Sequence, residues 1–396
     1  MAAEKFQPFR IDVADAVLDD LNTRLDLARF PVQAEGADWQ WGSNLDYMKS
    51  LVAYWRTEYD WRKAEAELNE FPQFIAPVTD PESGEVFDIH FVHVKGSIGP
   101  GGAAPTPLLI SHGWPGSFYE LLGIVDALAH PENHGAADAP AFDVIVPSLP
   151  GYGFSSAPAA PITPKDMARV LHVLMTDVLG YDSYATQGGD WGSVVTAWMA
   201  QANPEQVRAS HFNMLGLIPF VGKDSPPLTE EEATWAKTVR KRMKHEGGYQ
   251  AIQGTKPQTL AYGLTDSPVG LAAWIAEKFH GWPGAGADQP PPFSMDRLLT
   301  NIMIYWINGN INPANWLYIS LMNGSGAALA EGQRVEVPSG FAFFPWDLFP
   351  PPPESWVKRA YNVVHRTDMA SGGHFAAMER PNELITDIRV FFAKTL

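Results

Sequence analysis

The sequence predicts an α/β fold, a mostly parallel sheet with helices on both faces. Short apolar runs bounded by Gly, Pro or Asp alternate with helical patterns from residue 107 onward. The runs expected to form strands are 107–111, 142–148, 183–189, 207–213, 341–345 and 361–365. Such alternation is typical of a parallel sheet, and reactive groups gather at the carboxyl ends of its strands.

Four segments are predicted along the chain. An N-terminal extension with helical patterning covers 1–105, and the first part of the sheet-and-helix core covers 106–215. A helix-rich lid is expected at 216–335, because this segment interrupts the alternation and carries many aromatic residues. The second part of the core, 336–396, supplies the last two strands and a closing helix.

The composition limits the class of protein. Of 396 residues, 45% are hydrophobic and 18% are charged, which is the balance of a soluble globular chain. The formal net charge of −17 argues against nucleic acid or an anionic membrane as partner, because phosphate binding needs a basic surface. There is no cysteine, so disulfides, thiolate catalysis and cysteine-ligated metals are excluded.

The N-terminal sequence MAAEKFQPFR lacks the apolar stretch of a signal peptide. No stretch approaches the ~20 apolar residues that a membrane-spanning helix needs. We therefore expect a cytoplasmic protein without a membrane anchor.

Three polar side chains follow predicted strands. Asp190 follows SYATQGG, Asp347 follows FAFFPW, and His374 lies in the SGGHF segment after YNVVH. Their order along the chain, nucleophile, acid and histidine, is that of the catalytic triad of α/β hydrolases. Glycine-rich turns are expected to bring all three to one edge of the sheet.

The segment QGGDWGS has the frame of a strained strand-to-helix turn, the nucleophile elbow. Small residues Gly188 and Gly192 flank Asp190 at two-residue spacing, where a serine is usual. In this fold two backbone N–H groups form an oxyanion hole, one from the residue after the nucleophile and one from the loop after an earlier strand. The donors predicted on this basis are the amides of Trp191 and Trp114, the latter in the HGWPG segment.

An aspartate at the elbow predicts alkyl-ester chemistry. Its carboxylate is ionised at neutral pH, so it can displace a leaving group from a saturated carbon without a base. His374 would then activate water against the ester carbonyl, while Asp347 orients the imidazole ring. The substrate needs an electrophilic saturated carbon, which leaves an epoxide or an alkyl halide. The chemistry needs neither a metal nor a cofactor.

Together the motifs SHGWPGSFYE, PSLPGYGFSS, QGGDWGS, GFAFFPWDL and SGGHFAAMERP, with EYDWRKAEAELNEFPQF before them, resemble the microsomal-type epoxide hydrolases. The similarity runs through nearly the whole chain. Mammalian microsomal members carry an N-terminal membrane anchor that is missing here, so the chain is similar to shorter soluble fungal and bacterial relatives. The family's acid is Glu or Asp, and Asp347 takes that position.

The resemblance also implies two lid tyrosines that protonate the departing epoxide oxygen. By motif matching these are Tyr249 in HEGGYQAIQGTKP and Tyr318 in INPANWLYIS, with Tyr262 and Tyr305 as nearby rivals. A phenol stays protonated at neutral pH and suits donation to an alkoxide. The implied partners are water and a small lipophilic epoxide, which the chain would convert to a vicinal diol.

Two other functions stay open from the residues. A haloalkane dehalogenase shares the aspartate nucleophile, the tryptophan after it and the histidine, but it needs no tyrosine acid. A non-catalytic carrier of small lipophilic molecules could use the same fold. The N-terminal region either wraps the core or forms a homodimer contact.

Overall fold

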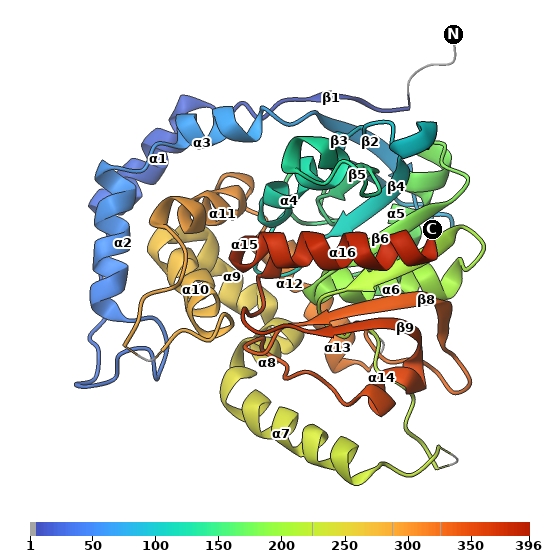
Figure 1. The fold of residues 1–396 in the computed structure, drawn as a ribbon. Coiled ribbons are helices and arrows are strands. Elements are labelled where there is room, and N and C mark those ends of the chain that lie inside the picture. The colour runs from blue at the N-terminus through green and yellow to red at the C-terminus, as the bar shows by residue number, and fades with distance from the viewer. Residues whose placement is uncertain (1–4, 224, 287, 325) are drawn as a thin grey trace.

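The computed structural model describes residues 5–396 except 224, 287 and 325. Residues 1–4 of the predicted extension and the other three, all in the predicted lid, lie outside the described part. A nine-stranded sheet in the order β1-β2-β3-β5-β4-β6-β7-β8-β9 runs through the molecule (Figure 1). Its strands are β1 Gln7–Phe9, β2 Gln73–Thr79, β3 Val86–Val94, β4 Thr106–Ser111, β5 Phe142–Pro147, β6 Tyr184–Gly188, β7 Val207–Phe212, β8 Val335–Phe343 and β9 Tyr361–Asp368.

The sheet is mostly parallel, as predicted. Strands β5, β4, β6, β7, β8 and β9 pair in parallel with one another, in that order. Strands β1, β2 and β3 form an antiparallel edge that joins the parallel part through β5. The parallel strands are rich in fully buried Val, Ile, Leu and Phe, because helices cover them from both sides.

The helices of the core form two layers. Helix α4 (Tyr119–Ala129) contacts α16 (Pro381–Thr395), and α5 (Pro164–Val173) contacts α6 (Asp190–Ala202) on the other face of the sheet. A π-helical turn, 174–178, extends α5. Two short helices, α14 (Glu354–Ala360) and α15 (Ala376–Glu379), lie in the C-terminal part of the core.

The segment between β7 and β8 is helical and forms most of the predicted lid. Its helices are α7 Glu230–Glu246, α8 Gly248–Thr255, α9 Pro257–Asp266, α10 Pro268–Gly281, α11 Met295–Asn308, α12 Ile311–Asn315 and α13 Leu317–Met322. In Figure 1 the lid lies beside and below the sheet, with α7 at its outer rim.

The N-terminal helices pack against this lid. They are α1 Asp15–Asp26, α2 Leu45–Thr57 and α3 Trp61–Leu68, and they flank α10 and α11 in Figure 1. Arg24 forms an ion pair with Asp266 at 2.7 Å, and the hydroxyls of Tyr59 and Thr300 are 3.1 Å apart. The extension therefore braces the predicted lid at α9 and α11.

The structure differs from the sequence prediction in two places, the N-terminal region 1–105 and the strand expected at 341–345. The N-terminal region also contributes β1, β2 and β3, which the helical pattern left out. Strand β8 begins already at Val335, inside the predicted lid. Pro338 and Gly340 lie at register shifts of this strand, and such residues read as strand breakers in a sequence. The four-segment division of the chain stays a prediction.

Among the described residues, no helix has both the length and the apolar character needed to cross a membrane.

Candidate active site

Asp190 lies at a sharp turn between β6 and α6. Its φ of +47° falls in the left-handed region that non-glycine residues rarely adopt. The flanking glycines are required by space: a Cβ on Gly188 would lie 2.4 Å from the Gly192 carbonyl oxygen. A Cβ on Gly192 would lie 2.0 Å from the carbonyl oxygen of Ser111, at the end of β4. The two-residue spacing in the sequence thus reflects a backbone packed against its neighbours.

The loop after β4 supplies a hydrogen-bond donor to this carboxylate. The backbone amide of Trp114 donates to Asp190 Oδ1 at 2.8 Å, and Trp114 itself is fully buried. Trp191, whose amide is the second predicted donor, is the second residue of α6 and directly follows Asp190. Its role stays a prediction.

His374 lies between two carboxylates. Its Nδ1 is 2.7 Å from Asp347 Oδ1, and its Nε2 is 3.4 Å from Asp190 Oδ2. Burial alone would lower the pKa of His374, but the charges of Asp347 and Asp190 and their hydrogen bonds outweigh burial and raise it well above its usual value. The structure therefore brings the three predicted triad residues together after β6, β8 and β9.

A third carboxyl group, that of Glu379, holds the loop that carries His374, and the sequence analysis missed it. The side chain of Glu379 accepts the backbone N–H of Gly373 at 2.8 Å and of Phe375 at 2.9 Å, one on each side of His374. Burial raises the pKa of Glu379 to about 7. Glu379 lies in the motif GGHFAAMERP, but the motif alone does not predict that its side chain accepts hydrogen bonds from the backbone of the same turn.

Glu120, also missed, is a second carboxyl group close to the triad. Its oxygen lies where a side chain on Gly116 would point, 2.1 Å from the position of a Cβ there. Burial is the largest cause that raises the pKa of Glu120, to about 8; the charge of His374 opposes it and the charge of Asp190 adds to it. A group of this kind beside a catalytic pair is a candidate proton carrier.

Tyr249 on α8 and Tyr318 on α13 face the elbow from the lid. Their rings are 5.5 Å apart and nearly perpendicular, and both side chains are buried. The amide of Gln250 donates to the Tyr249 hydroxyl at 3.0 Å, which leaves the Tyr249 proton available for another acceptor. The buried Tyr318 hydroxyl has no hydrogen-bond partner among the described residues. A buried hydroxyl without a partner is costly, and a substrate oxygen would satisfy it.

The rival tyrosines are placed differently. Tyr262 is 73% exposed. Tyr305 is buried, but its hydroxyl donates to the carbonyl of Gly116 at 2.7 Å. Neither lines the cavity described next, whereas Tyr249 and Tyr318 do.

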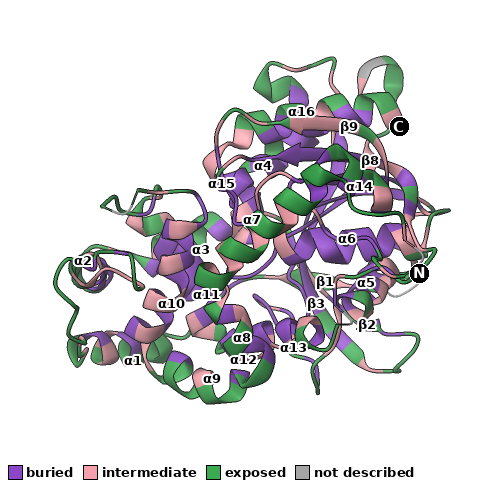
Figure 2. Ribbon diagram, turned by 90° about the horizontal axis from the view of Figure 1, so that it is seen from below, coloured by how far each residue is buried: buried purple, intermediate pink, exposed green. Residues whose placement is uncertain are grey.

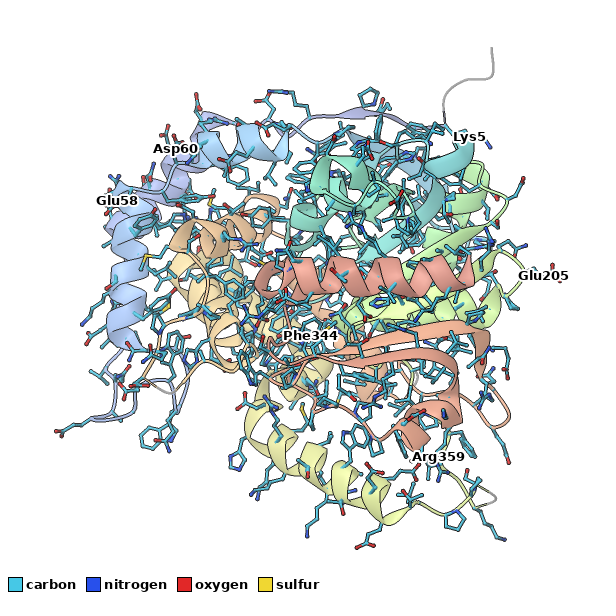
Figure 3. The ribbon with its side chains drawn as sticks, in the orientation of Figure 1. Lys5, Glu58, Asp60, Glu205, Phe344 and Arg359 are labelled. Carbon is cyan, nitrogen blue, oxygen red and sulfur yellow. The ribbon has the colours of Figure 1, made fainter. Side chains whose placement is uncertain are left out.

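A cavity of about 210 Å³ connects these groups to the surface. Asp190 and the two buried tyrosines line it, as do Trp235 on α7 and Pro350, which are partly exposed. Phe344, one of its lining residues, lies in the interior in Figure 3, while the other labelled side chains lie toward the periphery. The remaining walls are mainly apolar, formed by Val194, Met214, Leu215, Ile218, Val239, Leu321, Ala327, Phe343 and Phe349.

The sheet, the aspartate elbow and the adjacent histidine–aspartate pair define an α/β hydrolase. A family model described as alpha/beta hydrolase fold matches residues 106–244, and one described as epoxide hydrolase N terminus matches 6–121. The chain is 39% identical to epoxide hydrolase 1 of Sus scrofa over 98% of this chain and 88% of that relative. It therefore belongs to the epoxide hydrolase family, and the resemblance predicted from the motifs is confirmed.

Solved structures agree with this assignment. Aspergillus niger epoxide hydrolase is similar with a TM-score of 0.83 and 31% identity, over 98% of this chain and 96% of that chain. Juvenile hormone epoxide hydrolase of Bombyx mori is similar with a TM-score of 0.80 and 29% identity, over 98% and 94%. The prediction of an epoxide hydrolase, rather than a haloalkane dehalogenase or a carrier, is therefore confirmed.

Proposed function

We propose that the protein converts a lipophilic epoxide and water to a vicinal diol through a covalent ester on Asp190. The observation that carries this proposal is the arrangement around one carboxylate. A backbone amide and a histidine contact its two oxygens, and two tyrosine side chains lie on the wall of the same apolar cavity. An apolar wall with few polar groups suits a lipophilic substrate.

Ring opening uses Asp190 and the tyrosines. The Trp114 amide binds Oδ1, so Oδ2, which lies 3.4 Å from His374 Nε2, is the oxygen that attacks an epoxide carbon. As the new carbon–oxygen bond forms, the ring bond breaks and the departing oxygen takes a proton from Tyr249 or Tyr318. Burial raises the pKa of both phenols, and the charge of Asp190 raises it further, so both hydroxyls stay protonated until the ring opens.

Hydrolysis of the ester uses His374. In the resting enzyme the Asp190 and Asp347 carboxylates hold the pKa of His374 high, which favours the imidazolium. Esterification removes the charge of Asp190, so only Asp347 of the two carboxylates still raises the pKa of His374. His374 can then release its proton and act as general base for a water molecule, while Asp347 fixes the ring through Nδ1. Alkylation of Asp190 thus prepares the base for the second step.

The oxyanion that forms on Asp190 during hydrolysis needs donors already in place. The Trp114 amide is on Oδ1, the oxygen that becomes the ester carbonyl. We propose the Trp191 amide as the second donor. Each such donor is worth about 2.7–4 kcal/mol in transition-state stabilisation.

A single turnover in heavy-oxygen water tests the mechanism. The first diol formed on excess enzyme should contain no solvent oxygen, because its new oxygen comes from Asp190. Asp190→Ala should abolish diol formation, and mass spectrometry should find the adduct on Asp190 in the parent chain. Solvent oxygen in the first product would mean direct attack by water and would refute the proposal.

A cytoplasmic location and a homodimer stay predictions. The bracing of the lid by the N-terminal helices supports the wrapping role of the extension, and gel filtration with light scattering would test the dimer.

A further inference from the structure

Lys278 on α10 is a buried lysine beside the cavity. Its exposure is 5%, and a lysine is rarely buried to this extent unless it is paired with a charge. Its ammonium forms an ion pair with Glu277, the preceding residue. The side chain ends among aromatic rings rather than in solvent.

Three rings surround the ammonium of Lys278. Its Nζ is 4.7 Å from the ring centre of Tyr249 and 5.9 Å from the rings of both Trp274 and Trp282. A cation at these distances is attracted to the negative face of an aromatic ring, and more strongly when water is excluded. Tyr249 is the nearest of the three rings, and it is the proposed acid of the ring-opening step.

The Tyr249 ring is fixed by its other neighbours. It stacks on Trp114 with 5.1 Å between ring centres and 8° between planes, and it lies 5.3 Å from Trp282. Trp114 is the residue whose amide binds Asp190. A movement of the Tyr249 ring away from Lys278 would therefore disturb Trp114 and the loop whose amide binds Asp190.

The charges near the Tyr249 hydroxyl oppose its loss of a proton. Asp190 and Glu277 are negative and raise the pKa of Tyr249, and burial raises it more than either does. The amide of Gln250, which donates to the Tyr249 hydroxyl, lowers the pKa of Tyr249. Lys278 is the positive side chain over this ring, so it is placed to offset the carboxylates when Tyr249 becomes a phenolate.

We propose that Lys278 is a positioning residue for ring opening and that it acts through Tyr249. The inference rests on the acid role of Tyr249 given under the proposed function. When the Asp190–carbon bond forms and the ring carbon–oxygen bond breaks, the oxygen takes the hydroxyl proton of Tyr249. The negative charge left on the phenol is stabilised by the ammonium over its ring. Ester hydrolysis, which uses His374, gains nothing from this contact.

The test compares Lys278→Met with Lys278→Arg. Rapid quenching and mass spectrometry of the Asp190 ester give the rates of ester formation and of ester hydrolysis separately. Methionine keeps the length of the side chain without its charge, so ester formation should slow on the order of tenfold to hundredfold. Hydrolysis should stay unchanged, and Lys278→Arg should restore most of the rate of ester formation.

A matched control removes a cation from another ring. Lys165 lies 5.6 Å from the ring centre of Trp198, is exposed, and is outside the cavity lining. Lys165→Met should therefore leave both rates unchanged. Thermal unfolding of each variant shows whether a slow variant is simply unfolded.

The same substitutions in a Tyr249→Phe background decide whether Lys278 acts through Tyr249. There Lys278→Met should cause no further loss, because the phenol that it serves is gone. Equal losses with and without Tyr249, equal slowing of both steps, or no slowing at all would overturn the inference. A Tyr249→Phe variant with full activity would instead refute the acid role of Tyr249, which separates failure of the proposed function from failure of this inference.

Discussion

Helices α6 and α7 both border the cavity, yet they are held in opposite ways. Ten of the thirteen residues of α6 are buried, including every residue from Trp191 to Ala200. Of the seventeen residues of α7, Glu232 is the one that is buried. Figure 2 shows the contrast directly, with α6 mostly in the colour of buried residues and α7 mostly exposed.

This contrast separates the chemistry from the selection of substrate. Asp190 begins α6, so the nucleophile is fixed by the packing of the core. Helix α7 is attached to the rest of the protein at a few points. Arg359 contacts both carboxylate oxygens of Glu232 at 2.9 and 2.8 Å, and the indole of Trp235 donates to the Pro350 carbonyl at 2.9 Å. Changes on the α6 side should therefore alter rate constants, and changes on α7 should alter stability or substrate preference.

The largest effect is expected from His374→Gln. Without the base, ester hydrolysis should slow about a thousandfold or more, while ester formation continues. Mass spectrometry should then find Asp190 almost fully alkylated after one turnover. His134→Gln is the control, because His134 is exposed and pairs with Asp126 away from the cavity. Turnover of His374→Gln at the parent rate would contradict the assigned base.

Acidic pH should have the next largest effect, and on one step only. The hydrolysis step needs neutral His374, so its rate should fall about tenfold for each pH unit below the pKa of His374 in the ester form. Ester formation needs no neutral histidine, and the ester should accumulate as the pH falls. Rapid-quench measurements across the acid range would show this.

Glu379 and Glu120 also have raised pKa values, about 7 and about 8, and both interact electrostatically with His374. Glu379→Gln and Glu120→Gln, measured separately, should keep the fall in hydrolysis rate at acidic pH if His374 causes that fall. If either variant no longer shows the fall in hydrolysis rate at acidic pH, the carboxyl group removed in that variant causes the fall instead of His374.

Arg359→Met should lower stability, because it leaves the fully buried Glu232 carboxylate without its charged partner. We expect a loss of about 2–3 kcal/mol in the free energy of unfolding. Lys358→Met is the matched control, since Lys358 forms an exposed pair with Glu354 and should cost about 0.5 kcal/mol or less. Urea unfolding of both variants measures the difference. Equal losses would mean that the Glu232–Arg359 contact does not anchor α7.

The smallest effect is expected from Trp235→Ala, at a partly exposed position of the cavity wall. The loss of apolar contact should raise KM for a bulky epoxide about fivefold to tenfold with little change in kcat. A small epoxide that does not reach Trp235 should be unaffected. Trp41→Ala serves as control because Trp41 is 72% exposed and far from this cavity. Equal changes for small and bulky substrates would show that α7 does not select by size.

The sequence predicted the parts of the site that follow directly from chain order. Asp190, Asp347 and His374 could be located because each follows a recognisable strand, and parallel strands place their carboxyl ends together. Glycine spacing around Asp190 identified the elbow, since a backbone that crowds its neighbours tolerates only small residues there.

The parts that depend on tertiary contacts were not predictable in this way. Lys278 and Glu379 look like ordinary charged residues of helices, and only the packing of α10 and the fold of the histidine loop give them their partners. The onset of β8 was missed because Pro338 and Gly340 resemble breakers, although register shifts accommodate them.

The contact between the N-terminal helices and the lid has a consequence for engineering. Arg24 and Tyr59 hold α9 and α11 through Asp266 and Thr300, which lie more than two hundred positions later in the chain. A lid exchanged with that of a relative would lose these supports and shift the tyrosines that it carries. Chimeras intended to change selectivity should therefore transplant both segments as a pair.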